Sequence, residues 1–126
     1  MVQITKRKLD GVIGIIIWTQ DLDRLSRFYR DVLGLSPHSV HEDFVTFDFG
    51  GMRLNLGYHD QVEGPSKEPY RIMINLGTSD VHSFTEDLRA KGVPIIRPPE
   101  KEQWGGYVAT FQDPDGNTLQ LLQLPD

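Results

Sequence analysis

The chain has 126 residues, of which 38% are hydrophobic and 25% charged, with a formal net charge of −5 and no cysteine. These values describe one soluble globular domain with a hydrophobic core, and they exclude disulfides, thiolate catalysis and cysteine-ligated zinc. No apolar run reaches the roughly 20 residues of a membrane span, and no apolar segment follows the charged N-terminus as in a signal peptide. We therefore expect a cytoplasmic protein with no membrane or nucleic-acid partner, and an acidic surface that favours cationic small molecules.

The first half of the chain predicts a strand, a helix and three shorter strands. "GVIGIIIWT" at 11–19 is rich in β-branched residues and is typical of a buried strand. Asp21 can cap a helix whose apolar residues, with Phe28 and Tyr29 among the expected core, recur at helical spacing until Gly34. Strands are expected near 36–41, 44–49 and 52–57, with "FGGM" as the turn between the last two.

The second half repeats this order after a polar connector that contains Gly and Pro. Ser79 or Asp80 can cap the second helix, and Gly92 should end it. Asp80 follows Asp21 by 59 positions and Gly92 follows Gly34 by 58, so the two halves align as an internal repeat. Further strands are expected near 70–77, 93–97, 106–112 and 117–123.

This repeat predicts a single α+β domain, residues 1–126, built from two βαβββ modules. The modules span 10–58 and 69–124, and residues 59–68 form the linker. Each module should place its helix on one face of a curved mixed sheet, and the remaining faces should form a concave cleft.

Strand alternation divides each predicted sheet into an aliphatic face and a mixed face. The mixed faces carry Ile16, Trp18, Met73 and Leu122 beside small and polar residues, whereas strands that face solvent usually carry Lys, Glu and Thr. A half-apolar surface with a few polar groups is typical of a ligand cleft, and a face exposed to water is the alternative. The predicted cleft residues are Trp18, Arg53, Asn55, Tyr58, Met73, Asn75, Trp104 and Gln120.

Three aromatic residues of this set, Trp18, Tyr58 and Trp104, could stack on an aromatic ligand. Packing in the core or in a dimer interface is the alternative for each of them. The four histidines, His38, His41, His59 and His82, are scattered and do not predict a metal site.

Three stretches together resemble the vicinal oxygen chelate superfamily, which includes glyoxalase I, extradiol dioxygenases and bleomycin-resistance proteins. They are "TQDLDRLSRFYRDVLGL" at 19–35, "DVHSFTEDLRAKGVPI" at 80–95 and "GYVATFQDPDGNTLQLLQ" at 106–123. The resemblance covers nearly the whole chain and implies the same two-module fold.

The resemblance also identifies four positions that hold a metal ion in the enzymes of this superfamily. Here they are occupied by Gly14, Asn55, Met73 and Gln120. A divalent cation prefers carboxylate or imidazole ligands, so we expect no bound metal and no other cofactor.

The function expected from this pattern is metal-independent binding of a small molecule. The metal-free relatives that the chain resembles are dimers that hold a flat, often cationic drug between sheets, which implies antibiotic sequestration by a homodimer. The alternative is an enzyme of the lyase, isomerase or dioxygenase type with an atypical or metal-free site. Arg53 or Arg71 could then hold an anionic substrate, with a Tyr or His as acid and base. The residues show no paired nucleophile and base, and whether the modules pair within one chain or between chains stays open.

Overall fold

The structure is a computed structural model and describes residues 7–126. The first module contains β1 (Gly14–Thr19), α1 (Leu22–Arg27), the π-helical turn η1 (Phe28–Val32), β2 (Ser39–Val40), β3 (Phe44–Asp48) and β4 (Arg53–Tyr58). The second contains β5 (Met73–Gly77), α2 (Val81–Ala90), β6 (Ile95–Lys101), β7 (Tyr107–Gln112) and β8 (Thr118–Gln123).

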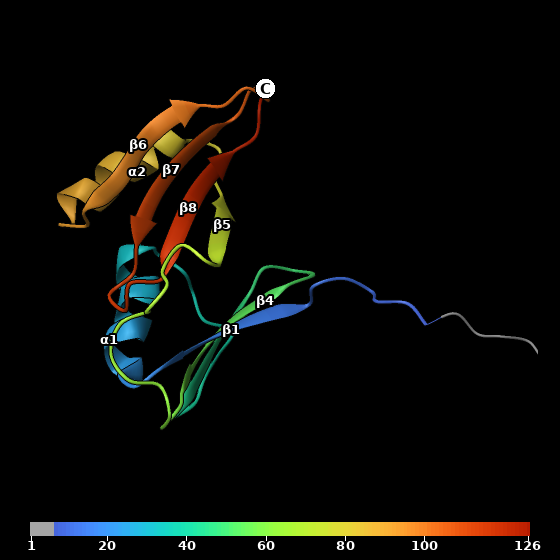
Figure 1. The fold of residues 1–126 in the computed structure, drawn as a ribbon, viewed down its shortest axis with the longest axis vertical. Helices are drawn as coiled ribbons and strands as arrows, with labels where there is room; N and C mark the ends of the chain where they lie inside the picture. Colours follow the sequence, from blue (N-terminus) through green and yellow to red (C-terminus); the bar gives the residue numbers. More distant parts are fainter. Residues whose placement is uncertain (1–6) are drawn as a thin grey trace, which may run out of the picture.

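The two modules have the same sheet topology. Each is a four-stranded sheet, in the orders β1-β4-β3-β2 and β5-β8-β7-β6. The first strand of each module pairs in parallel with its fourth, and the other pairs are antiparallel. Figure 1 shows the sheets as separate layers that are steeply inclined to one another, with α1 beside their junction. The predicted α+β fold with two βαβββ units is therefore confirmed.

The aliphatic faces predicted from strand alternation form the core. Ile17, Leu54 and Leu56 are buried in the first sheet, and Leu119 and Leu121 are buried in the second. Burying a side chain of this size stabilises the fold by about 1.5–3 kcal/mol. The opposite faces are thereby left free of the helices.

Both helix caps predicted from the sequence are present. The side chain of Asp21 accepts a hydrogen bond from the backbone N–H of Arg24 at 3.1 Å, and that of Asp80 accepts one from Ser83 at 3.0 Å. Gly34 and Gly92 follow the two helices with φ of 76° and 84°, a conformation that glycine adopts without strain.

Three strand boundaries differ from the prediction, each near a proline. The strand expected at 36–41 is reduced to β2, beyond Pro37. The strand expected from Tyr70 begins at Met73, because residues before it turn, with the Arg71 N–H bonded to the Glu68 carbonyl at 3.2 Å. β6 runs on through Pro98 and Pro99, with register shifts against β7, which is possible because β6 is an edge strand.

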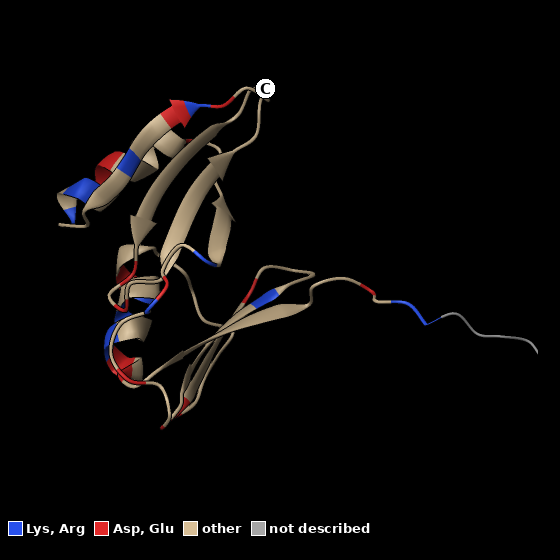
Figure 2. Ribbon diagram, viewed as in Figure 1, with Lys and Arg blue, Asp and Glu red and all other residues tan. Residues whose placement is uncertain are grey.

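Charged residues avoid most of the sheet surface. Figure 2 shows the charges gathered on the helices, on β6 and around the hairpins, whereas β5, β7 and β8 carry none. Within residues 7–126, no helix has both the length and the apolar character required to cross a bilayer.

Candidate functional site

The mixed face of the first sheet brings together β1 and β4. Ile16 lies opposite Asn55, and Trp18 lies opposite Gly57, in the parallel register of these strands. Trp18 is 40% exposed and Ile16 46%. This face therefore presents an aromatic and an aliphatic side chain to solvent beside a neutral amide.

Trp18 is held in place by its neighbours. A Cβ atom built on Gly57 would lie 2.6 Å from ring atom Cζ3 of Trp18, so the indole lies directly on the glycine. The ring centroids of Phe44 and His59 are 6.1 and 5.3 Å from that of Trp18. Because the ring is supported on three sides and still half exposed, it can act as a preformed stacking platform. The sequence predicts His59 in the linker, and no pattern in it indicates this contact with Trp18.

The two predicted amides occupy equivalent places in the two sheets. The Thr46 hydroxyl donates to Asn55 Oδ1 at 2.9 Å, and Gln120 Nε2 donates to the Thr110 hydroxyl at 3.3 Å. In each case the threonine lies directly opposite the amide on the neighbouring antiparallel strand. Asn55 Nδ2 also donates to the Ile15 carbonyl at 3.2 Å. The amides are therefore oriented by their own sheets before any ligand binds.

The mixed face of the second sheet is formed by β5 and β8, where Asn75 lies opposite Gln120. Met73 and Asn75 come from β5, which is an edge strand of its sheet. They also line a cavity of about 540 Å³, together with Ile15 and Leu54 of the first module. Among the described residues, no charged side chain lines this cavity.

Trp18 borders a second hollow, of about 440 Å³, between β1 and β5. Its walls include Ile16 and Ile72, and residues of the connector, with Lys67 among them, line it as well. The connector is therefore part of the surface around Trp18, a role that its polar, irregular sequence does not signal.

Three residues of the predicted set lie apart from these groups. Tyr58 lies on the same face of β4 as Leu54 and Leu56, which is the face opposite Trp18. Trp104 lies on Gly106, before β7, and is 50% exposed. Arg53 is exposed at the start of β4 and lies 3.6 Å from Asp48 in an ion pair.

The four positions implied for a metal fall into two pairs on different sheets. Gly14 and Asn55 are neighbours in the first sheet, where a Cβ on Gly14 would lie 3.6 Å from Asn55 Nδ2. Met73 and Gln120 belong to the second sheet. This donor set has no carboxylate and no imidazole, so it does not fit a hard divalent cation. Over residues 7–126, no three His, Asp or Glu side chains are grouped as metal ligands.

The site can therefore offer apolar contact, aromatic stacking and fixed neutral hydrogen-bonding groups. These properties suit the binding of an aromatic ligand, because stacking and hydrogen bonds require no ionisable group in the protein.

Comparison with known proteins places this geometry in a family. Residues 11–121 match the model of the Glyoxalase/Bleomycin resistance protein/Dioxygenase superfamily. A bleomycin resistance protein from Klebsiella pneumoniae is 47% identical over 114 residues, which cover 83% of this chain and 86% of that protein. A lactoylglutathione lyase from Arabidopsis thaliana is 33% identical over 88% of this chain, but the match spans only 43% of the plant protein.

A solved structure supports the same fold. The crystal structure of a glyoxalase/bleomycin resistance protein/dioxygenase from Nocardioides superposes with a TM-score of 0.76 at 22% identity, over 96% of this chain and 87% of that chain. The sequence match over 11–121 and the shared fold agree, and the chain belongs to the Glyoxalase/Bleomycin resistance protein/Dioxygenase superfamily.

Proposed function

We propose that this protein binds a small aromatic molecule without a metal ion, and that it sequesters an antibiotic. The observation that carries the proposal is the packing of Trp18, whose half-exposed ring lies on Gly57 beside the neutral amide of Asn55. Sequestration requires affinity and no catalytic group, which agrees with a face that carries no carboxylate or imidazole at the metal positions. The 47% identity to a bleomycin resistance protein supports the same ligand class.

We further propose that the protein acts as a homodimer in the cytoplasm. The mixed faces of one chain lie on two inclined sheets, and β1 and β5 are both edge strands. Exposed apolar side chains border these edges, among them Ile13 and Ile72, which are each 76% exposed. A second chain that covers these edges would remove this apolar surface from water. Light scattering that gives about the 14.4 kDa of one chain would contradict the dimer.

Fluorescence titration tests the ligand class. In a Trp104→Phe variant the emission comes from Trp18 alone, and in Trp18→Phe it comes from Trp104 alone. Titration with bleomycin, a flavin and a planar polyketide should quench Trp18 with at least one compound. No response of either tryptophan to any of the three would argue against sequestration.

The second candidate function is an enzyme of the same superfamily, because relatives named lactoylglutathione lyase match most of this chain. The donor set at Gly14, Asn55, Met73 and Gln120 speaks against a metal-dependent member. Elemental analysis of the purified protein separates the two: stoichiometric zinc, iron, manganese or nickel would refute metal independence. Turnover of a glutathione hemithioacetal by the metal-free protein would favour an enzyme over a binding protein.

A further inference from the structure

The first helix, which lies beside the junction of the two sheets, packs against residues of both of them. The ring of Tyr29, which is fully buried, is 6.3 Å from that of Phe47 in β3 of its own sheet. The ring of Phe28 is 6.4 Å from that of Phe111 in β7 of the other sheet. These two residues begin the π-helical turn η1. The same short segment therefore packs on both modules.

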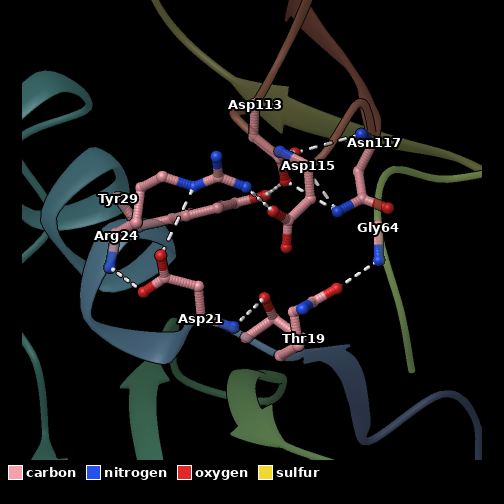
Figure 3. A network of polar contacts seen from close by, with 9 residues as sticks. Thr19, Asp21, Arg24, Tyr29, Gly64, Asp113, Asp115 and Asn117 are labelled. Atoms are coloured by element: carbon pink, nitrogen blue, oxygen red, sulfur yellow. Dashed lines mark hydrogen bonds and ion pairs between the residues drawn. The ribbon is translucent and has the colours of Figure 1, made fainter. Parts of the chain in front are cut away.

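Two polar contacts connect this helix to the turn after β7, residues 113–117 (Figure 3). The Tyr29 hydroxyl donates to Asp113 Oδ2 at 2.8 Å, and both side chains are buried. Arg24 Nη2 lies 2.5 Å from Asp115 Oδ1. Each contact joins residues more than 80 positions apart, so they are tertiary contacts between the modules.

The turn is rigidly organised around the carboxylate of Asp113. Its Oδ1 accepts hydrogen bonds from the backbone N–H groups of Asp115 and Asn117 at 2.9 and 3.0 Å, and Asn117 Nδ2 donates to Oδ2 at 2.9 Å. In addition to these bonds inside the turn, Asp113 Oδ2 accepts the hydrogen bond from the Tyr29 hydroxyl. Hydrogen bonds to an ionised acceptor are the stronger kind, so the turn is a firm attachment point.

The connector binds to the same turn. The backbone N–H of Ser66 donates to the Asp115 carbonyl at 2.8 Å, and the Gln20 side chain, next to α1, accepts from the backbone N–H of Gly64. The helix, the connector and the turn thus meet at one place. A separate contact lies at the other end of the helix, where Lys91 Nζ donates to the Val32 carbonyl at 3.2 Å.

We infer that the turn Asp113–Asn117 is the joint that fixes the first module on the second, and that Tyr29 and Arg24 are the positioning residues of this joint. The turn would otherwise serve only to connect β7 to β8, and Tyr29 would only fill the core. A purely local role predicts that loss of the Tyr29 hydroxyl leaves the relation of the two sheets unchanged. If the turn is the joint, loss of the hydroxyl should widen the range of angles between the two mixed faces.

Distance measurements between the modules test this inference, and the absence of native cysteines allows specific labelling. Spin labels at Val40→Cys in β2 and Ser83→Cys in α2 report the separation of the two modules, since both positions are exposed. Labelled protein is diluted with an excess of unlabelled protein, so that only distances within one chain contribute. The measurement requires no ligand and is independent of the proposed binding function.

The test variant is Tyr29→Phe combined with Arg24→Gln, and the control is Arg27→Gln. Arg27 lies in the same helix and pairs with Asp23 at 3.2 Å on the surface, so its loss leaves the joint intact. We expect the distance distribution to broaden and shift in the test variant and to stay as in the wild type in the control. If the double variant fails to fold by circular dichroism, Arg24→Gln alone is measured, because its side chain is half exposed. An unchanged distribution in the folded variant would overturn the inference.

Discussion

The support of Trp18 by Gly57 leads to a sharp prediction for Gly57→Ala. The added Cβ would lie 2.6 and 2.8 Å from ring atoms of Trp18 and 2.9 Å from a ring atom of Phe44. Carbon atoms do not approach so closely, so the indole must leave its seat. We expect the displaced ring to become more exposed and to lose its fixed orientation.

The magnitude follows from the packing. Overpacking costs about 1–3 kcal/mol, and we expect the low end, about 1 kcal/mol, because the half-exposed ring can move toward solvent. A fixed aromatic pair contributes about 0.5–1.5 kcal/mol beyond its buried area. Losing that orientation should weaken the binding of an aromatic ligand by roughly three- to tenfold.

The assay uses the Trp104→Phe background, in which emission reports Trp18 alone. Gly57→Ala should shift this emission to the red and lower the affinity for the aromatic ligand in calorimetry. Gly77→Ala is the matched control, because Gly77 also lies in a strand and a Cβ there would meet no atom within 4 Å. If Gly57→Ala and the control show the same emission and the same affinity, then Gly57 does not hold the Trp18 ring in place.

Three further predictions concern stability. Tyr29→Phe removes a buried hydrogen bond to a carboxylate and should lower the free energy of unfolding in urea by about 1.5–3 kcal/mol, whereas Tyr70→Phe, at an exposed position, should change it little. Gly106→Ala should lower the free energy of unfolding by about 3 kcal/mol or prevent folding, because its Cβ would lie 2.4 Å from the Gln123 carbonyl oxygen and 1.9 Å from a ring atom of Trp104. Burial raises the pKa of Asp113, although hydrogen bonds from Asn117 and Tyr29 act to lower it. At a pH between the usual and the raised pKa, Asp113 is protonated in the folded chain and ionised in the unfolded chain. Asp113 therefore stabilises the fold at low pH, and this contribution is lost as the pH rises through the raised pKa. When the pH is lowered from neutral to about 4, the free energy of unfolding of Asp113→Asn should therefore fall by more than that of the wild type. An equal fall in both proteins would contradict the raised pKa of Asp113.

Local signals predicted most of the fold. The caps at Asp21 and Asp80 and the glycines that end both helices depend on a few neighbouring residues, so the sequence alone indicates them. Strand alternation likewise assigned the buried face correctly, because it depends only on the two-residue period of a strand. The strand expected near 93–97 continues through Pro98 and Pro99 to Lys101, because β6 is an edge strand of its sheet.

Contacts between distant segments could not be predicted in this way. Tyr29 was expected in the core, and it is buried there, but nothing near it in the sequence indicates that its hydroxyl binds Asp113. The packing of His59 against Trp18 depends on the path of the chain after β4 and has no periodic signal. Tyr58 shows the converse: its aromatic character suggested the cleft, whereas alternation along β4 places it on the other face.

A ligand could contact one mixed face of a chain or both of them. Each face holds an amide fixed by a threonine, Asn55 in one sheet and Gln120 in the other, so the same chemistry occurs twice. If one ligand contacts both faces of a chain, its affinity must depend on the angle that the joint sets. Tyr29→Phe should then weaken binding even though Tyr29 lies on neither face. If the ligand contacts only the Trp18 face, Tyr29→Phe should leave affinity unchanged while Gly57→Ala lowers it, and calorimetry on the two variants separates these modes.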